Sequence, residues 1–339
     1  MLPPHAEMIR QLVATPSVSS SDARFDQSNQ GVIDLVAQWA SDLGFQTEIT
    51  AVPDTDGKAN LVATLGEGSD GLVLSGHTDT VPYNAERWTD DPFALTQRDG
   101  KLFGLGAADM KGFFAAALQA VSRVDRGRLR RPIVLLGTAD EESTMAGARA
   151  LVDRGEPLGR YAIIGEPTGL TPIKKHKGVL FVRITVGGKA GHASQPAEGV
   201  NAIEGIHEVM RALRAWRSGF ETRYRDDEFE VVSPTLNFGR IAGGDSPNRI
   251  PDECTLDIDM RLLPGMRSAD ILDELRDQAR TATDGAPWTV RVDAFGDYGA
   301  FGGPSDAGFQ RDVETVCGCS AKTALFCTEA PYLTQMGLE

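Results

Sequence analysis

The stretch VLLGTADEES, residues 134–143, passes from a run of apolar residues directly into three adjacent acidic ones. The apolar run is typical of a strand that is buried on both faces. Three neighbouring carboxylates repel one another and resist removal from water. A core strand that ends in such a cluster therefore implies a site at the end of that strand, where a cation or a chemical role accounts for the acidic residues.

Strands and helices alternate through the first half of the chain. Amphipathic helical patterns are followed by strand-like apolar runs, and the second helical pattern is stopped by Gly44. The predicted helices cover 5–15, 30–45, 110–124 and 146–155, and the predicted strands cover 45–52, 60–66, 71–76, 131–139 and 160–165. This alternation predicts an α/β fold with helices on both faces of the sheet.

The pattern changes at about residue 175, where residues 178–188 begin to alternate apolar and polar side chains. A strand does this when one of its faces meets water. Further strands are predicted at 233–244, 253–265 and 288–295, and further helices at 199–216 and 268–283. We expect a separate α+β domain whose sheet is covered on one face by these two helices. The predicted domains are a catalytic domain at 1–174, an inserted domain at 175–297 and a return segment of the catalytic domain at 298–339.

The charge balance restricts the partners of the chain. With a formal net charge of −14 and a pI near 4.9, it is not expected to bind nucleic acid or an anionic membrane. No secretory signal and no apolar run of membrane-spanning length is present, so we expect a cytoplasmic protein. The four cysteines form no CxxC pair, which argues against a zinc knuckle or a disulfide framework.

Histidine and carboxylate side chains recur at the ends of predicted elements in the first domain. They are His77 and Asp79 after one strand, Asp109 before a helix, 140–142 after a second strand and Glu166 after a third. Ligands of an open α/β sheet bind at the carboxyl ends of its strands, so we expect these groups at one edge. A single acidic residue there is usually a helix cap or a solvated loop residue. Imidazole with several carboxylates instead suits Zn, Co or Mn, and a carboxylate free of metal would be a general base.

These residues lie in segments that resemble a known family. SGHTDTVP, GLGAADMKG, TADEES and IIGEPTG resemble the motif set of the metallopeptidase M20 family. The segments HKG, GHASQPAEGVNAI, PTLNFGRIAGGDSPNRIP and CTEAPYL resemble the acetylornithine deacetylase branch of that family. The succinyl-diaminopimelate desuccinylase branch carries a Gly-Gly-Thr-Ser-type segment where this chain has CTEAPY. The resemblance, which runs from the first helix to residue 339, implies a mixed-sheet zinc-hydrolase catalytic domain with an inserted α+β dimerisation (lid) domain.

The resemblance also implies roles for individual residues. The implied ligands of two Zn²⁺ or Co²⁺ ions per subunit are His77, Asp109 as the bridge, Glu142 and Glu166. Glu141 would be the general base, and Asp79 would orient the His77 ring. The family has a cis peptide bond after its bridging Asp, which is the bond between Asp109 and Met110 here.

Further roles fall on the inserted domain and on the return segment. His192 would stabilise the oxyanion of the reaction, although by itself it could equally be an exposed loop residue. Asn237 and Arg249 would contact the substrate, with Arg249 pairing its α-carboxylate, although Arg249 alone would be taken for a surface residue. Glu329 in CTEAP is predicted to face the cationic end of the substrate.

The implied activity is that of a metal-dependent amidohydrolase. It would convert N2-acetyl-L-ornithine to ornithine and acetate in arginine biosynthesis, as a homodimer formed through residues 175–297. The alternatives are an M20 hydrolase of another N-acyl amino acid or dipeptide, and a catalytically inert dimeric homologue. The family's last metal ligand is a histidine beyond TEAPY, whereas no histidine follows His207 here. The second metal site is therefore expected to lack one ligand, and the return segment 298–339 is expected to be truncated.

Overall fold

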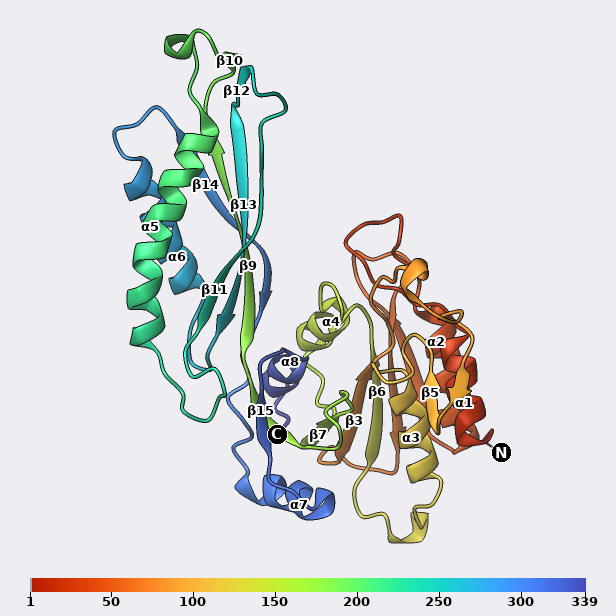
Figure 1. Cartoon of the computed structure of the whole chain (residues 1–339). Helices are drawn as coiled ribbons and strands as arrows, with labels where there is room; N and C mark the ends of the chain where they lie inside the picture. Colours follow the sequence, from red (N-terminus) through yellow and green to blue (C-terminus); the bar gives the residue numbers. More distant parts are fainter. Residues whose placement is uncertain (1) are drawn as a thin grey trace. The chain divides into compact units, whose positions relative to one another are not determined.

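The computed structural model describes residues 2–339 and divides into two compact units (Figure 1). Unit 1 runs to Thr171 and resumes over Pro304–Cys317 and Thr328–Glu339. Unit 2 comprises Pro172–Gly303 and Gly318–Cys327. Among the helices within residues 2–339, none combines the length and hydropathy needed to cross a bilayer.

Unit 1 is built on a five-stranded mixed sheet with the strand order β1-β2-β6-β3-β7. Its strands are β1 (Gln46–Ala51), β2 (Ala59–Leu65), β3 (Leu72–His77), β6 (Ile133–Thr138) and β7 (Tyr161–Ile164). β3 runs parallel to both β6 and β7, whereas β2 is antiparallel to β1 and β6. His77 is the register partner of Thr138, so the carboxyl ends of β3 and β6 lie side by side. The strands predicted from the apolar runs are all confirmed.

Helices cover both faces of this sheet, as the alternating pattern predicts. One face carries α1 (His5–Val13), α2 (Gln30–Asp42) and α3 (Gly112–Val121), which share a core with β2 and β6. Leu12, Leu61 and Phe114 are fully buried in this core, and each contributes about 1.5–3 kcal/mol to folding. The opposite face packs against α4 (Ala146–Arg154) and α8 (Ala330–Gln335) through Leu151 and Leu333.

The rest of unit 1 consists of short elements. β4 (Thr96–Arg98) and β5 (Lys101–Phe103) form a hairpin that the sequence analysis did not predict. Asp99 and Gly100 connect them with positive φ angles of 52° and 72°, as the tight two-residue turn of a hairpin requires. The other elements are the 3-10 helices η1 (Ala85–Arg87) and η2 (Arg126–Arg128), and α7 (Ala307–Cys317).

Unit 2 contains a four-stranded antiparallel sheet in the order β11-β13-β9-β14. The strands are β9 (Gly178–Gly187), β11 (Thr235–Gly243), β13 (Glu253–Leu262) and β14 (Thr289–Tyr298). Alternate residues such as Leu256 and Ile258 are buried under α5 (Ala202–Arg223) and α6 (Ser268–Thr283). On the other face, Arg183 donates to both carboxylate oxygens of Asp257 at 2.6 and 2.8 Å. The predicted sheet with two helices on one face is confirmed (Figure 1).

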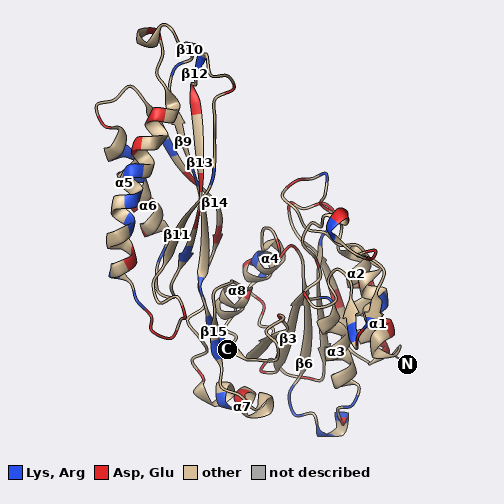
Figure 2. Cartoon of the chain, viewed as in Figure 1, with Lys and Arg blue, Asp and Glu red and all other residues tan. Residues whose placement is uncertain are grey.

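Basic and acidic residues both occur along α5 (Figure 2). Arg211 pairs with Glu208 at 2.7 Å, one helical turn away. The remaining elements of unit 2 are η3 (Pro196–Glu198) and two short strand pairs. β8 (Ile173–His176) runs parallel to β15 (Lys322–Ala324), and β10 (Gly191–His192) runs antiparallel to β12 (Arg249–Ile250).

Candidate metal centre

The parallel strands of unit 1 end at one edge of the sheet, and the predicted site residues follow them. β3 ends at His77, β6 leads into the turn that contains Glu141 and Glu142, and β7 leads to Glu166. Asp109 comes from the segment that precedes α3. The topology therefore brings these side chains together, because parallel neighbours present their carboxyl ends on the same side.

Two overlapping groups of ligand atoms form at this edge. In the first, atoms of His77, Glu141 and Glu166 all lie within 4.8 Å of one another. In the second, atoms of His77, Asp109 and Glu142 meet the same limit. The geometry thus places Glu141 as close to His77 as the residues predicted to be ligands. The division of labour between Glu141 as base and Glu142 as ligand stays a prediction.

The His77 ring is buried and held in a defined orientation. Its Nδ1 lies 3.1 Å from the carbonyl oxygen of Asp79. Because a carbonyl can only accept, Nδ1 carries a proton, and Nε2 is directed to the other side. Nε2 lies 3.2 Å from Oδ1 of Asp109. A second proton or a metal ion is needed to make that contact favourable, since an unprotonated ring nitrogen and a carboxylate oxygen repel each other.

Asp79 connects the loop after β3 to the turn after β6. Its side chain is fully buried, and its carboxylate accepts the backbone N–H groups of Glu141 at 3.2 Å and Glu142 at 3.1 Å. The carboxylate lies 3.6 Å from Nδ1 of His77, so the backbone carbonyl of Asp79 makes the hydrogen bond to the ring. Asp79 therefore fixes the positions of the two glutamates as directly as that of the imidazole.

The electrostatics of the cluster favour bound cations. Burial raises the pKa of Glu142 and of Glu166 to about 7, and it raises the pKa of Glu141 well above its usual range. Burial alone would lower the pKa of His77, but the contact with Asp109 and the surrounding carboxylates raise it well above its ordinary value. Each shift retains protons near neutral pH, and a divalent cation can take their place. An imidazole with several carboxylates is also a donor set that Zn²⁺ or Co²⁺ accepts, so the residues fit such an ion.

Glu329 lies beside this cluster at the start of α8. Its side chain is 1% exposed, and its Oε2 accepts a hydrogen bond of 2.8 Å from the Thr138 hydroxyl. Its Oε1 has no hydrogen-bond partner within the described residues 2–339. Burial raises the pKa of Glu329 to about 7, and the field of Glu166 adds to the effect. The carboxyl group is thus held close to the other acids with one oxygen unpaired.

The expected cis peptide bond between Asp109 and Met110 is confirmed. The Asp109 side chain is about half exposed, in contrast to the buried His77 that it contacts. One site feature was missed by the sequence analysis: Lys58, directly before β2, is buried and pairs with Asp140 at 2.7 Å. A single lysine before an apolar strand carries no signal of burial, because lysine is normally exposed.

The three residues predicted for the inserted domain lie in unit 2. His192 and Arg249 are register partners in the β10–β12 pair, and both are exposed. The backbone N–H of Ser194 donates to Nδ1 of His192 at 3.2 Å, so the ring proton lies on Nε2. Arg249 pairs with Asp245 at 2.5 Å, while Asn237 is exposed on β11.

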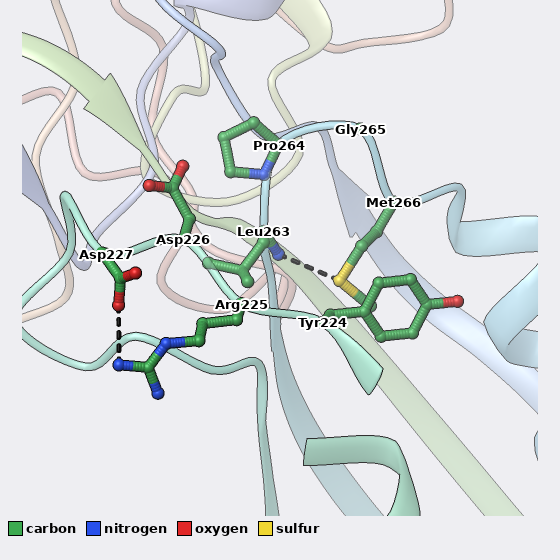
Figure 3. A pocket seen from close by; sticks show the side chains of 8 residues that line it. All are labelled: Tyr224, Arg225, Asp226, Asp227, Leu263, Pro264, Gly265 and Met266. Atoms are coloured by element: carbon green, nitrogen blue, oxygen red, sulfur yellow. Dashed lines mark hydrogen bonds and ion pairs between the residues drawn. The ribbon is translucent and has the colours of Figure 1, made fainter. Parts of the chain in front are cut away.

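A separate cavity of about 410 Å³ lies on unit 2, lined by residues 224–227 and 263–266 (Figure 3). Its charged lining is partly paired internally, since Arg225 lies 2.6 Å from Asp227. The N–H of Leu263 points at the sulfur of Met266 at 3.2 Å. The lining contains none of the residues that the sequence predicts for the site.

Comparisons with known proteins show which family the chain is similar to. Residues 73–333 match the model of peptidase family M20/M25/M40. The acetylornithine deacetylase of Proteus mirabilis is 46% identical over 333 residues, which are 98% of this chain and 86% of that protein. An M20 family metallo-carboxypeptidase from Sulfolobus solfataricus has a TM-score of 0.75 at 16% identity, covering 99% of this chain and 90% of its own. A dinuclear metal-binding M20 peptidase from Bacillus subtilis has a TM-score of 0.65 at 17% identity, and the match covers 98% of this chain and 86% of that chain.

Proposed function

The chain belongs to peptidase family M20/M25/M40, and from that premise we propose that it hydrolyses N2-acetyl-L-ornithine to L-ornithine and acetate. The observation that carries the proposal is the His77-centred cluster, in which two groups of ligand atoms meet within 4.8 Å at the edge of the unit 1 sheet. The identity of 46% to a deacetylase over nearly the whole chain supports the choice of an acetyl amide. We place the enzyme in arginine biosynthesis in the cytoplasm.

His77, Asp109, Glu142 and Glu166 would hold one or two divalent metal ions, Zn²⁺ or Co²⁺. Such an ion, when bound, polarises the scissile carbonyl and lowers the pKa of water. Asp109 would be the ligand shared by two ions, as the family resemblance implies, and its half-exposed carboxylate lies 3.2 Å from Nε2 of His77. The hydrogen bond between Nδ1 of His77 and the Asp79 carbonyl leaves Nε2 as the nitrogen available to a metal.

Glu141 would act as the general base and then as the general acid. It accepts a proton from the attacking water as the water oxygen forms its bond to the acetyl carbon. It then donates this proton to the leaving amine as the C–N bond breaks, so that acetate and a free amine result. Asp79 fixes the backbone from which Glu141 projects.

Residues of unit 2 and of α8 would recognise the substrate. His192 presents an N–H at Nε2, the kind of donor that stabilises a developing oxyanion. The Arg249 guanidinium can pair the α-carboxylate of the substrate in a bidentate manner, with Asn237 as a further polar contact. Glu329 would pair with the cationic side chain of ornithine through its free Oε1. We further propose that unit 2 forms the interface of a homodimer.

The proposal is tested by measuring metal content and turnover on the same purified sample. We expect the protein reconstituted with Co²⁺ or Zn²⁺ to hydrolyse N2-acetyl-L-ornithine in preference to N-acetyl amino acids with neutral side chains. A Glu141→Gln variant should retain its metal and lose about 10²–10⁴-fold in kcat, because only the proton transfer is removed. Turnover of the variant equal to that of the wild type would contradict the role of Glu141. Metal-loaded protein that cleaves only other acyl amino acids or dipeptides would contradict the substrate.

A further inference from the structure

A buried lysine connects three segments beside the metal centre. The Lys58 side chain is 1% exposed, and its Nζ lies 2.8 Å from Oδ1 of Asp26 and 2.7 Å from Oδ1 of Asp140. Asp140 is also nearly buried, with 7% of its side chain exposed. A buried ammonium group is tolerated only when it is paired, and here it is paired with two carboxylates.

Asp140 occupies the residue at which β6 turns into the acidic cluster. Its φ is +60°, a left-handed conformation that residues other than glycine adopt infrequently. Its carbonyl oxygen accepts the N–H groups of Thr144 at 3.0 Å and Met145 at 2.7 Å, which closes the turn. Its carboxylate accepts the Ser19 hydroxyl at 2.9 Å in addition to Lys58. A strained conformation of this kind persists only where the surroundings determine it.

Asn60 anchors the same turn from the same strand. Its Oδ1 accepts the N–H of Ala139 at 3.2 Å, and its Nδ2 donates to the carbonyl of Gly147 at 2.9 Å. Lys58 and Asn60 are two residues apart, so at the start of β2 they point to the same side. Lys58 and Asn60 therefore contact Ala139 and Asp140 on one side of the glutamates and Gly147 of α4 on the other. Glu141 and Glu142 extend from the chain between these contacts.

We propose that Lys58 is a positioning residue for the metal centre: its ammonium group holds the Asp140 carboxylate, and the turn fixed in this way presents Glu141 and Glu142. The inference rests on the proposed function, since it assigns the buried pair a role toward the bound metal. Without Lys58, the buried Asp140 carboxylate would lose its nearest cation and would repel the other carboxylates of the site, such as Asp79. The turn would then relieve the repulsion by moving, and the glutamates would move with it.

Asp26 provides a matched control. It is the other partner of Lys58, and it belongs to the segment before α2 rather than to the turn. An Asp26→Asn variant therefore perturbs the same buried ammonium group while leaving its contact with Asp140. A lysine that only stabilises the fold would be equally sensitive to the loss of either carboxylate.

The experiment measures the dissociation constant of Co²⁺ for the metal-free protein by competition with a chromophoric chelator. We expect Lys58→Met and Asp140→Asn to weaken Co²⁺ binding about 10–100-fold, the effect typical of residues that orient metal ligands. Lys58→Arg should recover part of the loss, and Asp26→Asn should stay within about twofold of the wild type. In the Co²⁺-loaded proteins, kcat should fall with the affinity while KM changes little. The Tm of each metal-free variant shows whether the substitution changes the stability of the fold, independently of its effect on Co²⁺ binding.

Equal Co²⁺ affinity of the folded Lys58→Met variant and the wild type would overturn the inference, and so would equal losses in Asp26→Asn and Asp140→Asn. If Lys58→Met does not fold, Ser19→Ala provides a milder test, because it removes the hydrogen bonds of the Ser19 hydroxyl to Asp140 and to Ser143 in the same turn, and no charge. A few-fold loss of affinity is expected there, and wild-type affinity in both Ser19→Ala and Asp140→Asn would overturn the inference. A wild-type chain that binds no Co²⁺ would overturn the metal centre, and this inference with it.

Discussion

The carboxylate of Asp79 accepts the backbone N–H of Glu142 at 3.1 Å, and this contact joins the end of β3 to the turn after β6. The other carboxylate oxygen accepts the N–H of Glu141 at 3.2 Å. One buried side chain thus sets the spacing between the imidazole that precedes it and the two glutamates.

We expect Asp79→Asn to weaken both metal affinity and kcat by about 10–100-fold. An amide has one acceptor oxygen where the carboxylate has two, so the N–H of either Glu141 or Glu142 loses its acceptor. Thr80→Val is the matched control, because the neighbouring Thr80 hydroxyl is buried and makes no hydrogen bond within residues 2–339. Similar metal affinities for the two variants would contradict this role for Asp79.

Metal should stabilise the protein more at high pH than at low pH. The folded metal-free chain holds protons on Glu142 and Glu166 up to about pH 7, above the range in which they titrate in an unfolded chain. Their contribution to metal-free stability is therefore present below about pH 4.5 and is lost as the pH rises through about 7. Bound metal replaces these protons, so the increase in Tm caused by Co²⁺ should be larger at pH 8 than at pH 5.5. The measurement is thermal unfolding with Co²⁺ and with EDTA at both pH values. An increase in Tm that is the same at both would contradict the protonated cluster.

Unit 2 should lose stability in acid because of His176. This residue is 2% exposed, and burial lowers its pKa to about 4. His176 takes up a proton near pH 6.5 in the unfolded chain but not in the folded chain. The contribution of His176 to the free energy of unfolding is therefore present above pH 6.5 and is lost as the pH falls toward 4. The full effect is at most about 3 kcal/mol.

The variant His176→Phe isolates this titration, since it removes the ionisable ring and retains an aromatic neighbour for Phe301. Urea unfolding of both proteins at pH 7 and pH 5 gives the loss of free energy for each. The wild type should lose more than the variant. Identical losses would show that the pKa of His176 does not differ between the folded and the unfolded chain.

Glu329→Gln should reduce the preference for a cationic substrate. The ratio of kcat/KM for N2-acetyl-L-ornithine to that for N-acetyl-L-norvaline, which lacks the terminal amine, should fall by roughly tenfold or more. The Thr138 hydroxyl can still donate to the amide oxygen of glutamine, so the position of the side chain is retained. An unchanged ratio in a variant with normal metal content would remove Glu329 from substrate recognition.

The strands β3, β6 and β7 could be predicted because each is a largely apolar run that ends in or leads to a chemically distinctive residue. His77 and Glu166 stand out in the sequence for that reason. Lys58 does not, since its burial depends on two carboxylates far away in the chain. The pairing of His192 with Arg249 was equally inaccessible, because a two-residue strand has no periodicity to reveal its register.

The path of the chain between the two units limits how the protein can be divided. The chain passes from one unit to the other after Thr171, Gly303, Cys317 and Cys327. Joining Thr171 directly to Pro304 would delete β8 and leave β15 without the strand with which it pairs. A fragment that contains unit 1 alone therefore needs a second splice that replaces residues 318–327, and a library of single-site truncations or split-protein pairs would not produce one.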